Sequence, residues 1–169
     1  PRISYYGEDT KDLLYATQLA GGSWMTETVE SQGDVGKYTA LAVDGAGAAR
    51  LTYFDESARD LKYATQQPGA SWVLQTVDSL GDVGRYSSIA IDSLGRIIIS
   101  EAGNERIQLR SQDGTWTSFG SSARDGPPGT FRLPAGIAVD DQDRIIIADE
   151  KNHRIQICDD GGNCTAFGS

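Results

Sequence analysis

Short apolar or alternating segments recur along the whole chain, and each is bounded by Gly, Asp, Asn or Ser. Their length is typical of β-strands and too short for helices. Ile97–Ile99 is continuously apolar, as in a strand that is covered on both faces. The pattern predicts strands at Arg2–Tyr6, Leu13–Thr17, Trp24–Val29, Thr39–Asp44, Ser88–Asp92, Arg96–Ser100, Arg106–Arg110, Thr115–Phe119 and Thr165–Gly168.

These segments repeat with a constant offset of 48 residues. In the first half, the Gly-Asp-Val-Gly of Gly33–Gly36 returns at Gly81–Gly84. In the second half, the Arg-Ile-Ile-Ile of Arg96–Ile99 returns at Arg144–Ile147. Similar Ile-Ala-Ile-Asp and Ile-Ala-Val-Asp segments, which end at Asp92 and Asp140, link the halves at the same spacing. One structural period therefore underlies two types of repeat.

Four antiparallel strands in about 48 residues, stacked in tandem, are typical of a β-propeller blade. A flat sandwich would not explain a constant offset. The sequence predicts an all-β propeller of about four blades, with 15 strands because the first blade lacks its inner strand. The chain forms a single propeller domain or a propeller fragment, with predicted blades at 1–38, 39–86, 87–134 and 135–169.

The ring has three possible completions. One chain could close as a four-bladed ring, two chains could form an eight-bladed ring, or the chain could be a piece of a longer propeller. The first residue is Pro1, which indicates a processed chain or a fragment. Because open blade ends leave unpaired edges, the sequence favours self-association, for instance a homodimer, or a missing partner segment.

The second half carries a family resemblance. The segments Phe131–Asp140, Arg144–Asp149 and Asn152–Gln156 resemble the NHL repeat, and the likeness covers about residues 88–169. It implies that the Ile-Ala-Val-Asp strand is the innermost of its blade and lines a central channel. Residues 1–87 resemble a second type of repeat, the Tyr-Ala-Thr and Ser-Trp blades of bacterial extracellular proteins. The combination predicts a natural hybrid or an assembled chain.

Composition excludes several classes of partner. The chain has 24 acidic and 15 basic residues, a net charge of −9, whereas nucleic-acid binding needs clustered Lys and Arg. No apolar run approaches the length of about 18 residues that a membrane helix requires. The sequence therefore predicts neither a nucleic-acid nor a membrane partner. Its 20 glycines indicate many tight turns.

The two cysteines, Cys158 and Cys164, flank a turn of five residues, Asp159–Asn163. This spacing places them near opposition on a hairpin, at a separation compatible with a disulfide. We predict that bond, which would indicate an extracellular or periplasmic location. The alternative is two reduced cysteines in a cytosolic chain.

Catalytic and metal chemistry find little support. The single histidine, His153, corresponds to Glu105 one repeat earlier, and it lies near no Ser or Cys motif. The acidic loops at Glu8–Asp12 and Asp55–Asp60 have interleaved Lys or Arg and no EF-hand spacing, so we expect solvated turns without calcium. We predict no enzyme activity, no metal and no cofactor. The recurring Asp44, Asp92 and Asp140 are expected to accept backbone N–H bonds from the turns that follow them.

Recognition is the remaining function. The Asp-Val-Gly-Lys/Arg-Tyr segments and the long loop at 121–134 fall on the face where propeller loops usually bind ligands. The predicted ligand-binding residues are Asp34, Lys37, Tyr38, Asp82, Arg85, Tyr86, Arg124 and Asp125. Trp24, Trp72 and Trp116 recur in the fourth strands, at the place that Cys164 takes in the last blade. Inter-blade packing is the expected role of these indoles, and sugar binding in grooves is the alternative.

We therefore predict a non-enzymatic propeller that presents loops on one face to a protein or a small ligand, including a glycan. One alternative is a purely structural fragment or hybrid with no ligand of its own. A second is a propeller lyase or hydrolase. NHL-like rings include lyases and are similar in shape to lactone hydrolases. Those enzymes place His and acidic residues around a metal in the channel, so a single histidine counts against this alternative.

Overall fold

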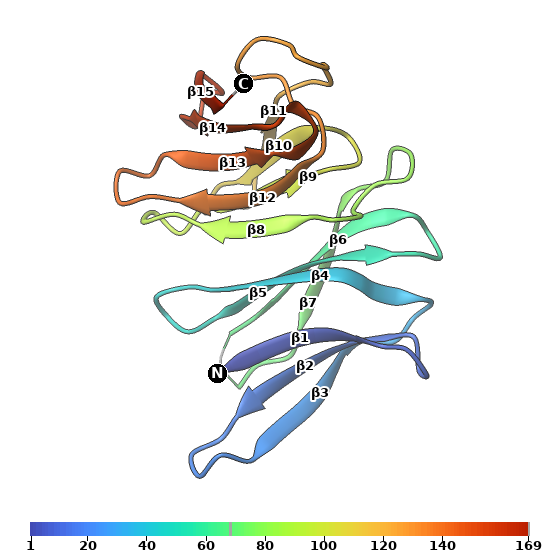
Figure 1. Cartoon of the computed structure of the whole chain (residues 1–169). Helices are drawn as coiled ribbons and strands as arrows, with labels where there is room; N and C mark the ends of the chain where they lie inside the picture. Colours follow the sequence, from blue (N-terminus) through green and yellow to red (C-terminus); the bar gives the residue numbers. More distant parts are fainter. Residues whose placement is uncertain (68, 169) are drawn as a thin grey trace. The chain divides into compact units, whose positions relative to one another are not determined.

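The computed structural model describes residues 1–67 and 69–168 (Figure 1). Within these residues the chain forms fifteen β-strands and one short 3-10 turn, Glu150–Asn152, and no α-helix. No helix of the described part is long and apolar enough to cross a membrane. The strands are β1 (Arg2–Gly7), β2 (Asp12–Gln18), β3 (Trp24–Glu30), β4 (Val35–Val43), β5 (Ala49–Asp55), β6 (Asp60–Gln66), β7 (Val73–Asp78), β8 (Ser88–Ile91), β9 (Ile97–Glu101), β10 (Arg106–Arg110), β11 (Trp116–Phe119), β12 (Pro134–Val139), β13 (Ile145–Asp149), β14 (Arg154–Cys158) and β15 (Cys164–Gly168).

The strands form four antiparallel sheets in chain order. We call them blade 1 (β1-β2-β3), blade 2 (β4-β5-β6-β7), blade 3 (β8-β9-β10-β11) and blade 4 (β12-β13-β14-β15). Each strand pairs with its neighbour in sequence, so every blade is a meander. This arrangement is β-propeller-like with about four blades, and blade 1 has three strands, as the repeat predicts.

The chain divides into two compact units, Pro1–Arg85 and Tyr86–Ser169. The first unit contains blades 1 and 2, and the second contains blades 3 and 4. The division falls where the sequence changes from one type of repeat to the other. The blade limits drawn from the sequence remain a prediction, and Ser169, at the end of the last predicted blade, lies outside the described residues.

The core of the first unit lies between its two blades. Leu13, Tyr15 and Val29 of blade 1 pack in one cluster with Leu51 and Tyr53 of blade 2. Trp72 joins this cluster edge-on to Tyr15, with ring centroids 5.1 Å apart. The predicted role in packing is therefore confirmed for Trp72, although it lies immediately before β7, whereas Trp24 at the start of β3 is 44% exposed.

The core of the second unit has the same plan. Ile107 and Leu109 of blade 3 pack with Ile145 and Ile147 of blade 4. Phe131, which precedes β12, is fully buried in the same cluster. Alternation along each strand accounts for this packing, because residues two apart point to the same face of a sheet.

The predicted structural role of the recurring aspartates is confirmed. One carboxylate oxygen of Asp140 accepts the backbone N–H groups of Gln142 and Arg144, at 3.0 and 2.9 Å. Its other oxygen accepts a bond from the Arg144 side chain at 2.7 Å. Asp44 and Asp92 bind their own turns and an arginine in the same way. These residues close hairpins and are not free for chemistry.

One predicted boundary is wrong: β4 begins at Val35 instead of Thr39, so Lys37 and Tyr38 lie in a strand. The strand starts early because Val35 and Lys37 pair with Asp55 and Phe54 of β5, with register shifts around Lys37. Gly36, between them, has a φ of +102°, and a Cβ there would lie 2.7 Å from Cα of Leu13 in blade 1. Only glycine allows the segment to come this near.

The predicted disulfide is confirmed. Cys158 of β14 lies directly opposite Cys164 of β15, and the two sulfur atoms are bonded at 1.98 Å. Cys158 is buried in the core of the second unit. The bond thus ties the outermost strand of blade 4 to the packed interior.

Candidate functional site

The predicted loop residues of the first unit form a chain of polar contacts, which we call the loop-face ladder: Tyr6, Asp34, Lys37, Glu56, Asp82 and Arg85. The Tyr6 hydroxyl donates to Asp34 at 2.8 Å, and Lys37 Nζ donates to Asp34 at 3.2 Å. Lys37 also reaches Glu56 at 3.4 Å, and Arg85 binds the other oxygen of Glu56 at 3.2 Å. Arg85 in turn binds Asp82 at 3.1 Å. The ladder therefore links the two predicted Asp-Val-Gly segments through Glu56.

Electrostatics keep Asp34 and Lys37 of the ladder ionised. The hydrogen bond to Asp34 raises the pKa of Tyr6, and the same carboxylate raises the pKa of Lys37. Partial burial alone would raise the pKa of Asp34, but the bonds from Tyr6 and Lys37 outweigh it and hold that pKa below its usual value. Each charged side chain thus has a partner within the ladder. These contacts occupy many of the donors and acceptors that a ligand would need.

Aromatic rings lie beside the ladder. The Arg85 guanidinium lies over the ring of Phe54, 4.6 Å from the ring centroid. Tyr38 lies 6.2 Å from the same ring and is 38% exposed. Lys37 lies 5.4 Å from the centroid of the Tyr6 ring. These stacked cations are held in place, because a cation over an aromatic face is attracted to it.

The other predicted ligand residues belong to the second unit. Tyr86 is 55% exposed and lines a hollow of about 310 Å³ with Leu133, Ala135 and Glu150. Arg124 and Asp125 lie at an exposed tip and form a loose ion pair, 3.5 Å apart. The structure brings Asp34, Lys37, Asp82 and Arg85 together, and it places Tyr86 and the Arg124–Asp125 pair in separate surroundings.

The long loop at 121–134 is held to blade 4 by side chains of that blade. Asn152 donates to the carbonyl of Ala123 and accepts the N–H of Asp125, both at 3.0 Å. Gln156 donates to Thr130 at 2.7 Å, and Arg154 donates to Thr130 at 2.8 Å. Side chains of blade 4 thus anchor this loop, which we call the strap, while Arg124 and Asp125 stay exposed and their predicted role in binding remains a prediction.

Those three side chains converge on a buried carboxylate, Asp149, which is fully shielded from solvent. One of its oxygens accepts bonds from Asn152, Arg154 and Gln156, at 3.0, 2.8 and 2.9 Å. Its other oxygen accepts the backbone N–H of Arg132 at 2.6 Å. Blade 3 has the same set in Glu101, Asn104, Arg106 and Gln108. The recurrent Asn, Arg and Gln of the second half are therefore part of the scaffold.

A groove in the first unit was not predicted from the sequence. It has two adjoining parts, of about 330 and 470 Å³, which share Glu27, Gln66, Gly69 and Ala70 as lining residues. Arg2, Tyr15 and Thr17 line the first part, and Trp72 and Ser71 line the second. We call this site the inter-blade groove.

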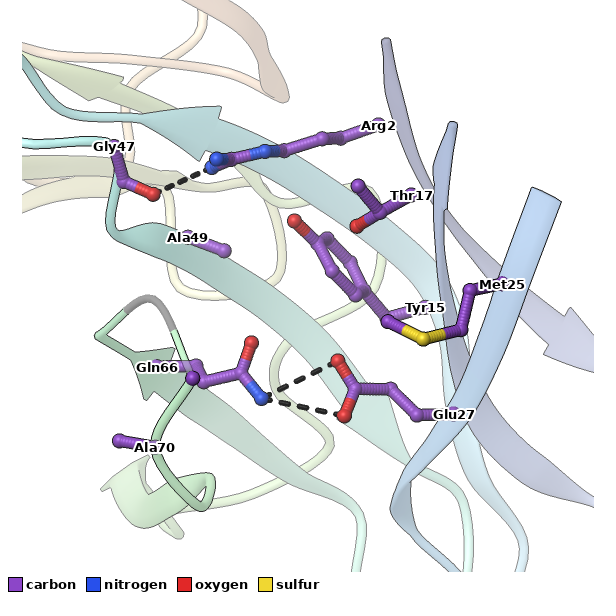
Figure 2. Close-up of a pocket in the computed structure, with 10 residues that line it drawn as sticks. Arg2, Tyr15, Thr17, Met25, Glu27, Gly47, Ala49, Gln66 and Ala70 are labelled. Carbon is purple, nitrogen blue, oxygen red and sulfur yellow. Dashed lines mark hydrogen bonds between the residues drawn. The ribbon is translucent and has the colours of Figure 1, made fainter. Parts of the chain in front are cut away.

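Figure 2 shows how the polar groups of the groove lie. Glu27 of β3 and Gln66 of β6 point toward one another, and the Gln66 amide donates to both carboxylate oxygens, at 3.2 and 3.3 Å. Arg2 extends across the other side and donates to the carbonyl of Gly47 at 2.6 Å. The Tyr15 ring lies between these two bridges. The indole N–H of Trp72 is buried, and no described residue accepts it.

One signal could have identified the groove. Sugar binding in grooves is the alternative role of the recurring indoles, and Trp72 does line a groove with polar side chains. The repeat could not identify Glu27, because the residue 48 positions later is Gln75 and the carboxylate does not recur. The partner of Glu27 lies 39 residues away in sequence and is near it only because two blades stack.

The remaining chemical candidate, His153, lines a hollow of about 430 Å³ with Glu150 and Arg154. His153 is exposed, follows the 3-10 turn and has a φ of +53°. Among the described residues, no group of three or more His, Cys, Asp or Glu side chains is placed to hold a metal ion. The turn at Asp55–Asp60 is instead a folded hairpin, in which Asp55 accepts the N–H of Ala58 at 3.0 Å.

Comparisons with known proteins agree on the fold. The sequence profile of the NHL repeat matches residues 131–158. A search of curated protein sequences found no match. The resemblance of the first half to a second type of repeat remains a prediction.

Solved structures of β-propeller proteins resemble this chain. A streptogramin B lyase structure superposes with a TM-score of 0.70 and 17% identity, over 100% of this chain and 54% of that one. A gluconolactonase from Xanthomonas campestris gives 0.60 and 15%, over 98% and 60%. An auxiliary nutrient binding protein from Bacteroides thetaiotaomicron gives 0.58 and 13%, over 98% and 45%. The chain thus spans about half the length of these proteins, and the likeness establishes the fold alone.

Proposed function

We propose that this protein is a non-enzymatic recognition module that binds a small, neutral, hydroxyl-rich ligand, such as a sugar, in the inter-blade groove. The observation that carries the proposal is the bridge between Glu27 and Gln66, set in a groove that Trp72 and Tyr15 also line. Small-molecule sites are concave and combine aromatic surface with a few placed polar groups. The groove meets that description in this unit.

The chemistry of the lining favours a neutral ligand. Arg2 and Glu27 contribute one positive and one negative charge, so the groove offers donors and acceptors without an excess of either sign. Thr17, Gln66 and Ser71 add neutral hydroxyl and amide groups. A sugar pairs its hydroxyls with such groups and lays its C–H face on an aromatic ring.

Two of the fold relatives are enzymes, a lyase and a gluconolactonase, so the alternative function for this protein is catalysis. The features that favour recognition are the exposed position of His153 in a turn and the structural duties of Asp44, Asp92 and Asp140. The auxiliary nutrient binding protein shows that this fold also occurs in a protein named for binding.

The loop-face ladder is the second candidate surface, and the specific observation in its favour is the exposed ring of Tyr38 beside Arg85 and Phe54. A protein ligand could contact that ring and the exposed edges of Asp82 and Arg85. Since the ladder charges already have partners, we expect this surface to contribute less than the groove.

The test is titration calorimetry of the intact chain with a panel of neutral sugars: glucose, galactose, fucose and N-acetylglucosamine. Glu27→Ala and Gln66→Ala should each weaken binding by about tenfold, because each leaves a ligand hydroxyl unpaired. Gln75→Ala is the matched control, since Gln75 occupies the position of Glu27 one repeat later and lies outside the groove. Trp72→Ala should abolish binding, whereas Trp24→Ala, which removes an exposed indole elsewhere, should not.

Circular dichroism separates loss of binding from loss of fold in each variant. If no sugar binds, or if Glu27→Ala and Gln66→Ala bind as well as the parent, the groove proposal is wrong. Loss of binding in a quadruple Asp34→Asn, Lys37→Gln, Asp82→Asn, Arg85→Gln variant alone would transfer the site to the loop-face ladder. Turnover of a lactone or a streptogramin by the protein would establish the enzymatic alternative.

A further inference from the structure

Corresponding positions of the repeat differ sharply in burial at one face of the first unit. Leu51 and Tyr53 of β5 are fully buried, because they pack against blade 1. The residues 48 positions earlier are Ile3 and Tyr5 of β1, and they are 47% and 36% exposed. The sequence thus carries similar apolar side chains in blade 1, and the described part of its unit leaves them partly exposed. We call this surface the β1 face.

The second unit has a matching surface on blade 4. Ile107 of β10 is fully buried against blade 4, whereas its counterpart Ile155 of β14 is 42% exposed. Phe119 of β11 packs 6.2 Å from Phe131, whereas its counterpart Phe167 of β15 is 58% exposed. A hollow of about 430 Å³ lies there, lined by the apolar Ala148, Ile155 and Phe167 and by the polar Glu150, His153 and Arg154. We call this surface the β14 face.

The two faces are complementary in kind. Each blade has one turn that contains a non-glycine residue with positive φ. This residue is Lys11 after β1, Arg59 after β5, Glu105 after β9 and His153 after β13. Counted from these turns, Ile155 takes the place of Leu13, since each follows its turn residue by two positions. Leu13 packs in one cluster with Leu51 and Tyr53, the counterparts of Ile3 and Tyr5. A β14 face is therefore built to receive a β1 face.

We propose that the β14 face of one chain docks on the β1 face of a second copy, and that the reciprocal contact closes a two-chain ring. Each chain carries one face of each kind, so the contact is head-to-tail, and two copies suffice to satisfy both. The chain covers 54% and 45% of two of its propeller relatives, so two copies supply about the length of one. The proposal does not depend on the function of the groove.

Sedimentation equilibrium of the intact chain, over a range of concentrations, is the first test. The expected species has twice the mass of one chain. Ile3→Lys and Ile155→Asp should each raise the dissociation constant by about tenfold or more, because each places a charge in both junctions. Leu94→Lys and Leu80→Asp are matched controls at exposed positions outside the two faces, and they should leave the mass unchanged.

Mixing the two single variants tests the head-to-tail geometry. The mixed dimer has one unaltered junction and one junction that pairs Lys with Asp, so the double-mass species should return. If like faces paired instead, one of the single variants would remain a dimer. A chain that stays single at every concentration, a larger open assembly, or a mixture that does not restore the dimer would overturn the proposal.

Discussion

The buried carboxylate Asp149 offers a demanding test of how blade 4 is held together. Replacing it with asparagine keeps the shape of the side chain and removes the charge. Three donors, from Asn152, Arg154 and Gln156, point at one oxygen of Asp149, and the Arg132 N–H points at the other. An asparagine that keeps its oxygen toward Arg132 turns its own NH₂ group toward those three donors.

The cost follows from the bonds lost. In that orientation three hydrogen bonds are lost, and in the opposite one the bond from Arg132 is lost, so at about 1 kcal/mol each the bonds account for about 1–3 kcal/mol. The Arg154 guanidinium, whose side chain is only 11% exposed, also loses its counter-charge. Removing one partner of a buried ion pair costs about 3–5 kcal/mol. We therefore expect Asp149→Asn to lower the free energy of unfolding by at least about 3 kcal/mol.

Urea unfolding followed by circular dichroism measures this loss, with the slope of the transition compared between variants. Asp141→Asn is the control, because Asp141 is an exposed acid in a nearby turn. The control should change stability by less than about 0.5 kcal/mol. A loss below about 1 kcal/mol for Asp149→Asn would refute the view that this carboxylate organises the blade.

Three further predictions concern the second unit. Asn152→Ala removes the two bonds that hold the strap near Arg124, so trypsin should cleave after Arg124 about tenfold faster, and an unchanged rate would contradict the strap. Reducing the bond between Cys158 and Cys164, which are six residues apart, should cost about 2 kcal/mol and lower the urea midpoint. The side-chain bond from Arg144 holds the pKa of Asp140 below its ordinary value. A depressed carboxyl pKa stabilises the fold above about pH 4 and loses that effect as pH falls through the depressed value, so the Tm of the parent should fall more steeply with acid than that of Asp140→Asn.

Much of the fold could be predicted from the sequence because each strand ends at a local turn signal. Asp140 and its counterparts close hairpins with bonds that span only two to four residues, so one repeat contains all the information. The start of β4 could not be predicted, because the same Gly-Asp-Val-Gly segment recurs at Gly81–Gly84, where the next strand begins only at Ser88. The prediction failed where two identical segments pair differently with the strand that follows.

The site was harder to predict, because its residues come together from different blades. Asp34 and Lys37 were chosen for their residue types, and the structure shows them engaged with Tyr6 and Glu56, which the repeat did not link to them. The groove depends on Glu27, whose residue type does not recur. Two other lining residues, Gln66 and Trp72, do recur, at Gln18 and Trp24, so the repeat reveals only part of the groove.

The central claim is that a ligand occupies the inter-blade groove, and nuclear magnetic resonance of the three indole N–H groups tests it most directly. The chain has three tryptophans, so the spectrum of the nitrogen-15-labelled protein should contain three indole signals, which single Trp→Phe variants assign. Titration with the sugar that binds most tightly should shift the Trp72 signal and leave those of Trp24 and Trp116 in place. A shift of either of the other two signals without Trp72, or no shift at saturation, would contradict the account.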